Sequence, residues 1–195
     1  MQRKQLTKQV ILGILAGWAF VFRLLEFPLL GFLKLDFSDV PVLVGGLISG
    51  PVGAFCVALI RDILGYIRSG GEAGVPLGSL MSLVASMTLY GIFQWGLSHW
   101  PNKWTLKQNM SIVVTSTLAL TLVMSVFNYF VALPLYGILL NFPVGDYIAF
   151  ILGSIVPFNL IKGLIIGTLL VLCLPSVTAF LRHRGWLYVT YQKKM

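Results

Sequence analysis

The segment VPFNLIKG, residues 156–163, lies within the last long apolar run of the chain, which covers about residues 147–174. A run of this length predicts a helix that crosses a membrane. A lysine in such a helix costs about 3 kcal/mol or more on insertion scales, so Lys162 indicates a buried polar site. Asn159 precedes Lys162 by about one helical turn and therefore lies on the same face.

The composition of the whole chain agrees with this interpretation. Hydrophobic residues make up 57% of the sequence and charged residues only 10%, whereas soluble domains carry about 25% charged residues. We therefore expect an all-α integral membrane protein. No long polar stretch could form a second domain, so residues 1–195 are predicted to be a single membrane domain. Residues 175–195 are expected to form a cytoplasmic or interfacial tail.

Hydropathy and turn residues divide the chain into six predicted spans. The second and third spans are short, and the tight turn GPVG, residues 50–53, separates them. A four-span alternative, with this hairpin re-entrant, also remains open because neither short span reaches the length of a full crossing. The six predicted spans are about Gln9–Phe27, Val40–Leu47, Ala54–Ile67, Leu77–Leu97, Met110–Leu133 and Tyr147–Leu174.

Charge sets the expected orientation. Three segments carry basic residues and no acid, whereas the opposite loops are acidic on balance. This positive-inside pattern predicts that both termini are cytoplasmic in a bacterial plasma membrane. It also explains the net charge of +8 through topology and anionic lipid, without nucleic acid. The nine basic residues are Arg3, Lys4, Lys8, Lys103, Lys107, Arg182, Arg184, Lys193 and Lys194.

Two further pairs of charges lie within predicted spans. Arg23 and Glu26 are spaced to meet on one helical face, so we expect them to neutralise each other. Arg61 and Asp62 are adjacent and point about 100° apart on a helix, so we expect them not to pair well and to need partners elsewhere.

Lys162 has no acidic neighbour within a helical turn, so its partner must be distant: a carboxylate, a set of carbonyls or a ligand. Asn128, deep in the fifth span, and Asn159 offer amide groups near it. The alternative is a structural or assembly membrane protein without a ligand, in which these groups link helices. The ammonium favours a ligand, because links between helices rarely need a charge.

Enzymatic functions lack support in the sequence. It holds no Ser–His or metal constellation and no phosphate-binding loop, so we expect no catalytic residue, metal or cofactor and an energy source on another chain. A proton pathway would need a chain of acidic or histidine residues through the bilayer. The small residues Gly13, Ala16 and Gly17 on the first span permit close helix approach, either within this chain or to a partner membrane protein.

Taken together, these motifs resemble the substrate-binding S components of energy-coupling factor (ECF) vitamin transporters, and most closely the riboflavin-specific members. The resemblance covers nearly the whole chain. It rests on EFP (26–28), LKLDFSDVP (33–41), GPVG (50–53), MSVFNYF (124–130) and VPFNLIKG (156–163).

The resemblance implies a six-helix bundle that captures a vitamin from outside and is not an enzyme. In this family the flavin-ring contacts fall on Asn128, Asn159 and Lys162, and the first outer loop, around residues 33–38, covers the pocket with Leu35 and Asp36. The Gly13–Gly17 face docks onto a transmembrane coupling subunit that two cytoplasmic ATPases drive, and the vitamin is a transported substrate rather than a cofactor.

One segment departs from the family pattern. Riboflavin members usually carry an acid or amide near Ser79 and an alanine–asparagine–phenylalanine run near residues 81–83. This chain has Ser79 and Ser82 at the polar positions and no aromatic there. A smaller ligand would fit such a pocket, and anionic pantothenate would suit Lys162 electrostatically. Riboflavin remains the preferred ligand, with pantothenate or another B vitamin as the alternative.

Overall fold

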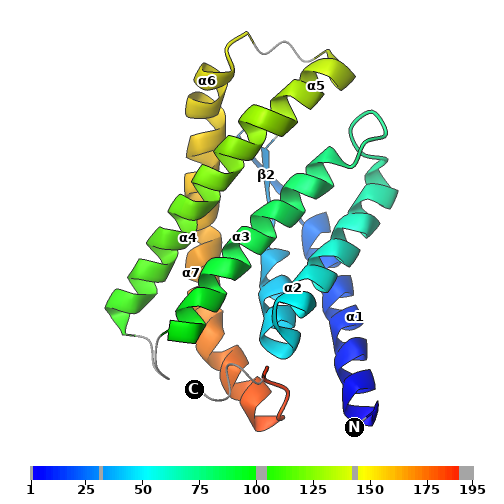
Figure 1. The fold of residues 1–195 in the computed structure, drawn as a ribbon, viewed down its shortest axis with the longest axis vertical. Helices are drawn as coiled ribbons and strands as arrows, with labels where there is room; N and C mark the ends of the chain where they lie inside the picture. The colour runs from blue at the N-terminus through cyan, green and yellow to red at the C-terminus, as the bar shows by residue number, and fades with distance from the viewer. Residues whose placement is uncertain (1, 31–32, 100–104, 142–144, 189–195) are drawn as a thin grey trace.

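The protein was analysed as a computed structural model that describes residues 2–30, 33–99, 105–141 and 145–188. Its long helices run side by side (Figure 1). α1 (Gln2–Leu24) packs along α2 (Asp39–Ser69), α3 (Leu77–His99) packs against both α2 and α4 (Leu106–Phe127), and α4 packs along α7 (Val156–His183). Several basic residues of the charge analysis, among them Lys103, Lys193 and Lys194, lie outside the described residues.

Five stretches of the described chain are helical, long and apolar enough to cross a membrane, which confirms the all-helical membrane class. The fourth continues from α4 through η1 (Asn128–Ala132) into α5 (Leu133–Leu140), and the fifth runs through α6 (Tyr147–Phe150) and η2 (Ile151–Ile155) into α7. α7 passes Pro175 and ends at His183. The first part of the predicted tail, up to His183, therefore continues the last helix.

α2 is bent back on itself at the GPVG turn. Ser49 and Gly50 have non-helical dihedrals, and Gly50 has φ +69°. In a straight helix Asp39 and Arg61 would lie about 33 Å apart, yet Asp39 Oδ1 lies 3.6 Å from Arg61 Nη1. The two halves therefore lie side by side (Figure 1). They pack closely, because a Cβ on Gly53 would lie 2.3 Å from the Gly45 carbonyl oxygen.

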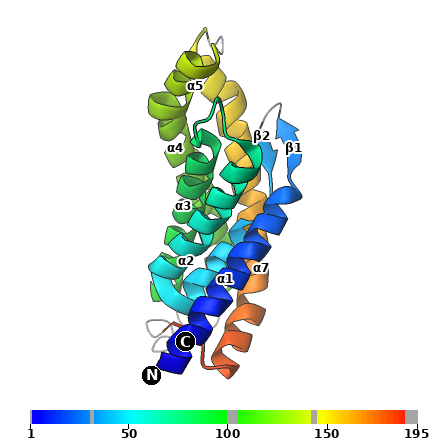
Figure 2. The same cartoon turned by 90° about the vertical axis from the view of Figure 1, so that its right-hand side faces the viewer.

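The bend leaves helical carbonyls without their usual donors, and both ends of the described chain supply replacements. Pro51 has no N–H to give to the Leu47 carbonyl, and the Tyr188 N–H donates to it at 2.7 Å. The Lys8 ammonium donates to the Ile48 carbonyl at 3.3 Å. The beginning of α1 and the segment after α7 are therefore held at the bend, at the same end of the bundle (Figure 2).

A β-hairpin connects α1 to α2 at the opposite end (Figure 2). β1 (Phe27–Leu30) pairs antiparallel with β2 (Leu33–Leu35). The sequence predicted only a loop here, because strands this short carry too few residues for a period-two pattern. The hairpin replaces the predicted last turn of the first span, and α1 ends at Leu24 rather than near Phe27.

Candidate ligand-binding site

A cavity of about 520 Å³ lies at the hairpin end of the bundle. Its volume falls within the range of about 300–1,000 Å³ typical of small-molecule sites. Residues from α1, the hairpin, α2, α3, α4, α5 and α7 line it, together with the loop after α2. The charged members are four basic and three acidic side chains: Arg23, Lys34, Arg68, Lys162, Glu26, Asp36 and Glu72.

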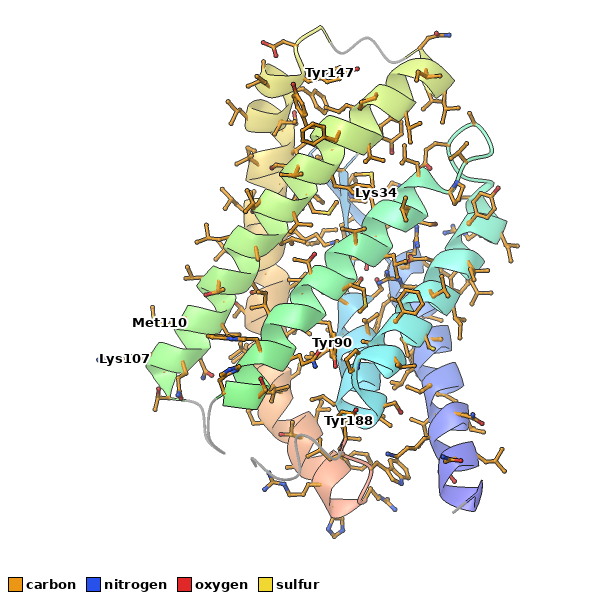
Figure 3. The ribbon with its side chains drawn as sticks, in the orientation of Figure 1. Lys34, Tyr90, Lys107, Met110, Tyr147 and Tyr188 are labelled. Carbon is orange, nitrogen blue, oxygen red and sulfur yellow. The ribbon has the colours of Figure 1, made fainter. Side chains whose placement is uncertain are left out.

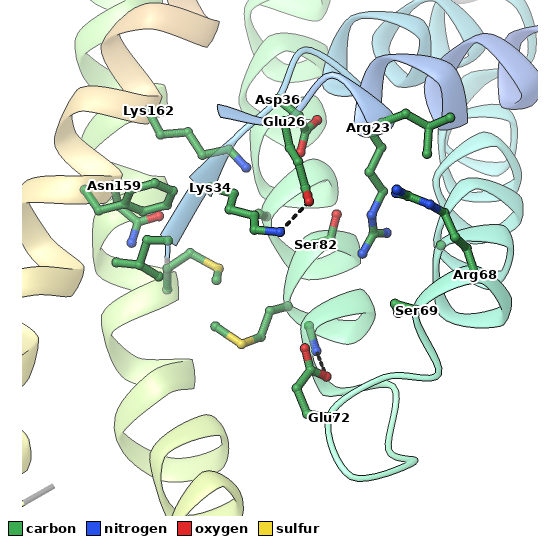
Figure 4. A pocket seen from close by; sticks show the side chains of 18 of the residues that line it. Arg23, Glu26, Lys34, Asp36, Arg68, Ser69, Glu72, Ser82, Asn159 and Lys162 are labelled. Carbon is green, nitrogen blue, oxygen red and sulfur yellow. Dashed lines mark hydrogen bonds and ion pairs between the residues drawn. The ribbon is translucent and has the colours of Figure 1, made fainter. Parts of the chain in front are cut away.

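Lys162 lies at one side of this cavity, with its ammonium directed inward (Figure 4). The residue is 9% exposed. Its Nζ lies 3.9 Å from Asp39 Oδ2, within ion-pair range but too long for a hydrogen bond. The sequence predicted a distant partner for Lys162, and the structure identifies a carboxylate from the N-terminal end of α2.

Asp36 lines the same cavity from the segment after β2. The Ser38 N–H donates to Asp36 Oδ1 at 2.8 Å. Burial alone would raise the pKa of Asp36, but the positive charge of Lys162 and the hydrogen bonds from Ser38 outweigh burial and lower it. Asp36 therefore stays ionised beside Lys162.

The two asparagines occupy similar positions on their helices but differ in access to the cavity. Asn159 lines the cavity, and its amide donates to the Ile155 carbonyl at 2.8 Å. Asn128 begins the π-helical segment η1, and its amide donates to the Met124 carbonyl at 2.7 Å. Asn128 is 2% exposed and does not line the cavity, whereas Met124 does. Helical segments with π geometry frequently mark functional sites.

Leu35 is also set back from the cavity. It is buried in the hydrophobic core, whereas its neighbours Lys34 and Asp36 reach the cavity wall. Leu33, at the start of β2, also lines the cavity. The hairpin therefore presents charged side chains to the cavity while Leu35 anchors it to the bundle.

Ser79 and Ser82 belong to a buried ionic network. The Ser79 hydroxyl donates to the Asp62 backbone carbonyl at 3.1 Å and accepts from Arg23 at 3.4 Å. Ser82 accepts from Arg61 Nη2 at 2.9 Å, and it also lines the cavity. The segment that departs from the family pattern thus supports the arginines beside the cavity.

The prediction that Arg61 and Asp62 would not pair was wrong. Arg61 donates Nε–H to Asp62 Oδ1 at 3.1 Å and Nη2–H to Asp62 Oδ2 at 2.8 Å. The long arginine side chain folds back along the helix and so overcomes the angle between neighbouring Cβ bonds. Both residues also have the predicted partners from other elements, since Arg61 reaches Ser38 and Asp62 pairs with Arg23.

The prediction that Arg23 and Glu26 would neutralise each other was also wrong. Arg23 pairs with Asp62 across the α1–α2 interface, and Glu26 pairs with Lys34 across the hairpin. Because α1 ends at Leu24, Glu26 lies outside the helix and no longer shares a helical face with Arg23. The dashed line between Lys34 and Glu26 marks this rim pair (Figure 4).

Sequence reasoning missed the role of Asp39. It appeared only within the segment LKLDFSDVP, residues 33–41, yet it is buried and lies between Arg61 and Lys162. The available signal was an aspartate directly before an apolar span, at the membrane side where Lys162 was expected. Among the described residues, no group of three His, Cys, Asp or Glu side chains could hold a metal ion.

The three small residues of α1 separate into two environments. Gly13 and Gly17 are exposed, and no atom lies within 4 Å of a Cβ built on either glycine. Ala16 is fully buried in the core. The expected docking face therefore retains Gly13 and Gly17, whereas Ala16 packs within the chain.

Comparison with known proteins gives consistent matches. The family model described as the ECF transporter substrate-specific component matches residues 4–174. The riboflavin transporter RibU of Staphylococcus aureus is 32% identical over 94% of this chain and 96% of its own length. The riboflavin transporter FmnP of Bacillus subtilis is 36% identical over 82% of this chain and 85% of its own length.

A solved structure of the S component of a bacterial ECF transporter also matches the fold. The match has a TM-score of 0.67 and 33% sequence identity, and it covers 91% of this chain and 99% of the other. At this identity the match supports kinship as well as fold.

Proposed function

Because the chain belongs to the family of ECF transporter substrate-specific components, we propose that it is the riboflavin-binding subunit of an ECF importer. It is a multi-pass bacterial membrane protein. The observation that carries the proposal is the cavity at the hairpin end of the bundle, lined by Lys162, Asn159 and Asp36. Relatives named riboflavin transporters match the chain over most of its length.

The charges around the cavity favour a neutral ligand over an anion. Lys162 lies beside Asp39, and its charge also acts on Asp36. Arg23 is paired with Asp62, and Lys34 with Glu26. With these cations already compensated, anionic pantothenate loses the electrostatic advantage that Lys162 alone would give. Riboflavin is uncharged and carries polar ring edges and hydroxyls that suit this lining.

We assign ligand contacts first to the cavity-lining residues Lys162, Asn159, Ser82 and Asp36. For Asn128, Leu35 and Ser79, which are set back in this structure, we propose that contact with the ligand follows a local adjustment of η1, the hairpin or α3. The ammonium, amide, hydroxyl and carboxylate groups among these side chains can hydrogen-bond both the ring and the hydroxyl chain of a flavin.

Membership in the family implies association with coupling and ATPase subunits. We propose one transmembrane coupling subunit and two cytoplasmic ATPases, which supply the energy for transport. The exposed Gly13 and Gly17 face on α1 is our candidate for the contact with the coupling subunit, since small residues permit close helix approach.

We also propose six membrane segments with both termini in the cytoplasm. The bend at Gly50 gives α2 two antiparallel halves, each of which counts as one segment. The basic residues Lys8, Lys107, Arg182 and Arg184 occur in the end segments that the positive-inside pattern assigns to the cytoplasm. The cavity then opens toward the outside, where the vitamin is captured.

Fluorescence titration of the purified chain tests the proposal. We expect stoichiometric riboflavin binding without nucleotide, with quenched flavin fluorescence. Lys162→Met should keep the fold and lose about 1.5–3 kcal/mol of binding free energy, as for a charged hydrogen bond. Lys107→Met makes the same change at the far end of α4 (Figure 3) and should bind normally.

Two outcomes would contradict the proposal. A protein that ignores riboflavin but binds labelled pantothenate would assign it to the other vitamin. A protein that binds neither vitamin, and whose Lys162→Met variant changes only in thermal stability, would support a purely structural role for Lys162.

A further inference from the structure

Asp39 is buried behind the cavity wall and lies within ion-pair distance of two buried cations, Arg61 and Lys162. Its side chain is 4% exposed, and it is absent from the cavity lining. It lies in the first turn of the helix α2, where the helix dipole stabilises a carboxylate. An ionised carboxylate at this depth persists only with partners, so its two oxygens reveal what it does.

The two carboxylate oxygens of Asp39 have different surroundings. Oδ1 accepts a hydrogen bond from the Ser86 hydroxyl and lies 3.6 Å from Arg61 Nη1. Oδ2 is buried, accepts no hydrogen bond from the described part of the chain, and lies 3.9 Å from Lys162 Nζ. Oδ1 is therefore fixed to the scaffold, whereas Oδ2 remains available to Lys162.

Arg61 holds Asp39 in this position. The guanidinium is fully buried and donates to Ser38, Ser86, Ser82 and Asp62, all between 2.8 and 3.1 Å. These bonds account for its five N–H groups. Because all its donors are engaged by these partners, Arg61 has no N–H left for the ligand. It acts as a rigid support for the Asp39 carboxylate.

From this arrangement we infer that Asp39 is the positioning and specificity-determining residue of the ligand site. Its carboxylate holds the Lys162 ammonium aimed into the cavity, and it compensates the positive charge so that the cavity accepts an uncharged ligand. On ligand binding, the ammonium donates to the ligand and to Asp39 Oδ2 together. The inference rests on the proposed function, since it takes riboflavin as the uncharged ligand.

A double-mutant cycle in riboflavin affinity tests this role. Asp39→Asn should weaken riboflavin binding about tenfold or more, as expected when a charged hydrogen-bond partner is lost. In a Lys162→Met background the same change should have little further effect. The absorption band of bound riboflavin should also shift in Asp39→Asn toward its position in Lys162→Met, because both variants alter the same contact to the flavin.

Asp62→Asn is the matched control. Asp62 is another buried aspartate paired with Arg61, but within the described chain its ion pairs are with Arg61 and Arg23 and not with Lys162. Its effect on riboflavin affinity should add to that of Lys162→Met. Additive effects for Asp39 as well, with an unchanged flavin spectrum, would overturn the positioning role and leave Asp39 a structural residue.

Ser86→Ala covers the case in which Asp39→Asn does not fold. It removes the hydroxyl that fixes Oδ1 and leaves every charge in place. It should weaken riboflavin binding less than Asp39→Asn does, and only when Lys162 is present; equal weakening in both backgrounds would overturn the inference. If the wild-type protein does not bind riboflavin, the proposed function itself is refuted. If it binds riboflavin but Asp39 and Lys162 show no coupling, only the positioning role of Asp39 is refuted.

Discussion

Arg61 is a buried cation whose hydrogen-bonding capacity is filled within the described chain. Its partners come from the segment before α2, from α2 itself and from α3. A guanidinium is suited to this position because its five donors point in fixed directions. Removing part of such a buried network leaves polar groups without partners, which is costly.

Arg61→Lys should therefore destabilise the fold although it preserves the charge. The ammonium has three donors and cannot replace the two parallel bonds to Asp62, so we expect a loss of about 2–4 kcal/mol. Thermal unfolding in detergent measures this. Arg68→Lys, the same change at an exposed arginine, should alter stability by less than about 0.5 kcal/mol. Equal effects at both positions would contradict the supporting role of Arg61.

At the residue scale, the sequence predicted which polar groups are buried better than it predicted their partners. The cost of a lysine in an apolar span marked Lys162, and the structure places it at the cavity. The partners of Arg23, Glu26 and Arg61 were mispredicted because each depends on where a helix ends or on how a long side chain folds back. Helical spacing contains neither kind of information.

At the scale of elements, the bend in α2 depends on a single glycine. Gly50 has φ +69° and ψ −157°, a conformation that is essentially restricted to glycine. A Cβ at this position would also meet the Tyr188 ring at 2.8 Å. The turn was predictable from GPVG. The clamp on the bend, meaning the hydrogen bonds from the Tyr188 N–H and the Lys8 ammonium, was not, because neither contact follows a local pattern.

Gly50→Ala should lower the melting temperature by more than Gly70→Ala does. Both glycines have positive φ, near +70°. A Cβ on Gly70 would meet no atom within 4 Å, and at its ψ of −1° alanine is strained by only about 1–2 kcal/mol. Gly50→Ala adds the collision with Tyr188. Combining it with Tyr188→Ala should recover part of the loss, and a loss no larger than at Gly70 would argue against the clamp.

The hairpin and the π-helical segments show what the sequence could not specify. β1 and β2 contain too few residues to display alternation, so a covering loop was the best available prediction. η1 and η2 lie inside continuous apolar runs, where an extra residue per turn leaves no compositional mark. Residues 128 and 159 were nevertheless selected correctly as polar groups within spans, although only Asn159 reaches the cavity surface.

At the scale of the whole molecule, the charge distribution and the fold together predict how the protein is oriented in the membrane. The cavity lies at one end of the bundle, and the beginning of α1 and the end of α7 lie at the other (Figures 1 and 2). If the proposed topology holds, the end that carries Tyr147 faces outward and the end that carries Lys107 faces the cytoplasm (Figure 3).

Labelling of single cysteines on intact cells tests this orientation, in a background with Cys56 and Cys173 replaced. A membrane-impermeant thiol reagent should label Gly145→Cys on intact cells, because this exposed residue precedes α6 at the cavity end. Lys107→Cys should be labelled only after permeabilisation. The reverse pattern would invert the topology, and labelling of both from outside would require an even number of membrane segments between them.

The clamp on the α2 bend has a consequence for biosynthesis. Leu47 is made early, whereas the Tyr188 N–H that satisfies its carbonyl follows all of the described helices. Until the ribosome has added that residue, only water or lipid headgroups can hydrogen-bond the carbonyl, because the hydrocarbon interior offers no donor. The bend must therefore stay at the membrane surface during insertion, and the Leu47 carbonyl gains this hydrogen bond only after the last described helix has been made.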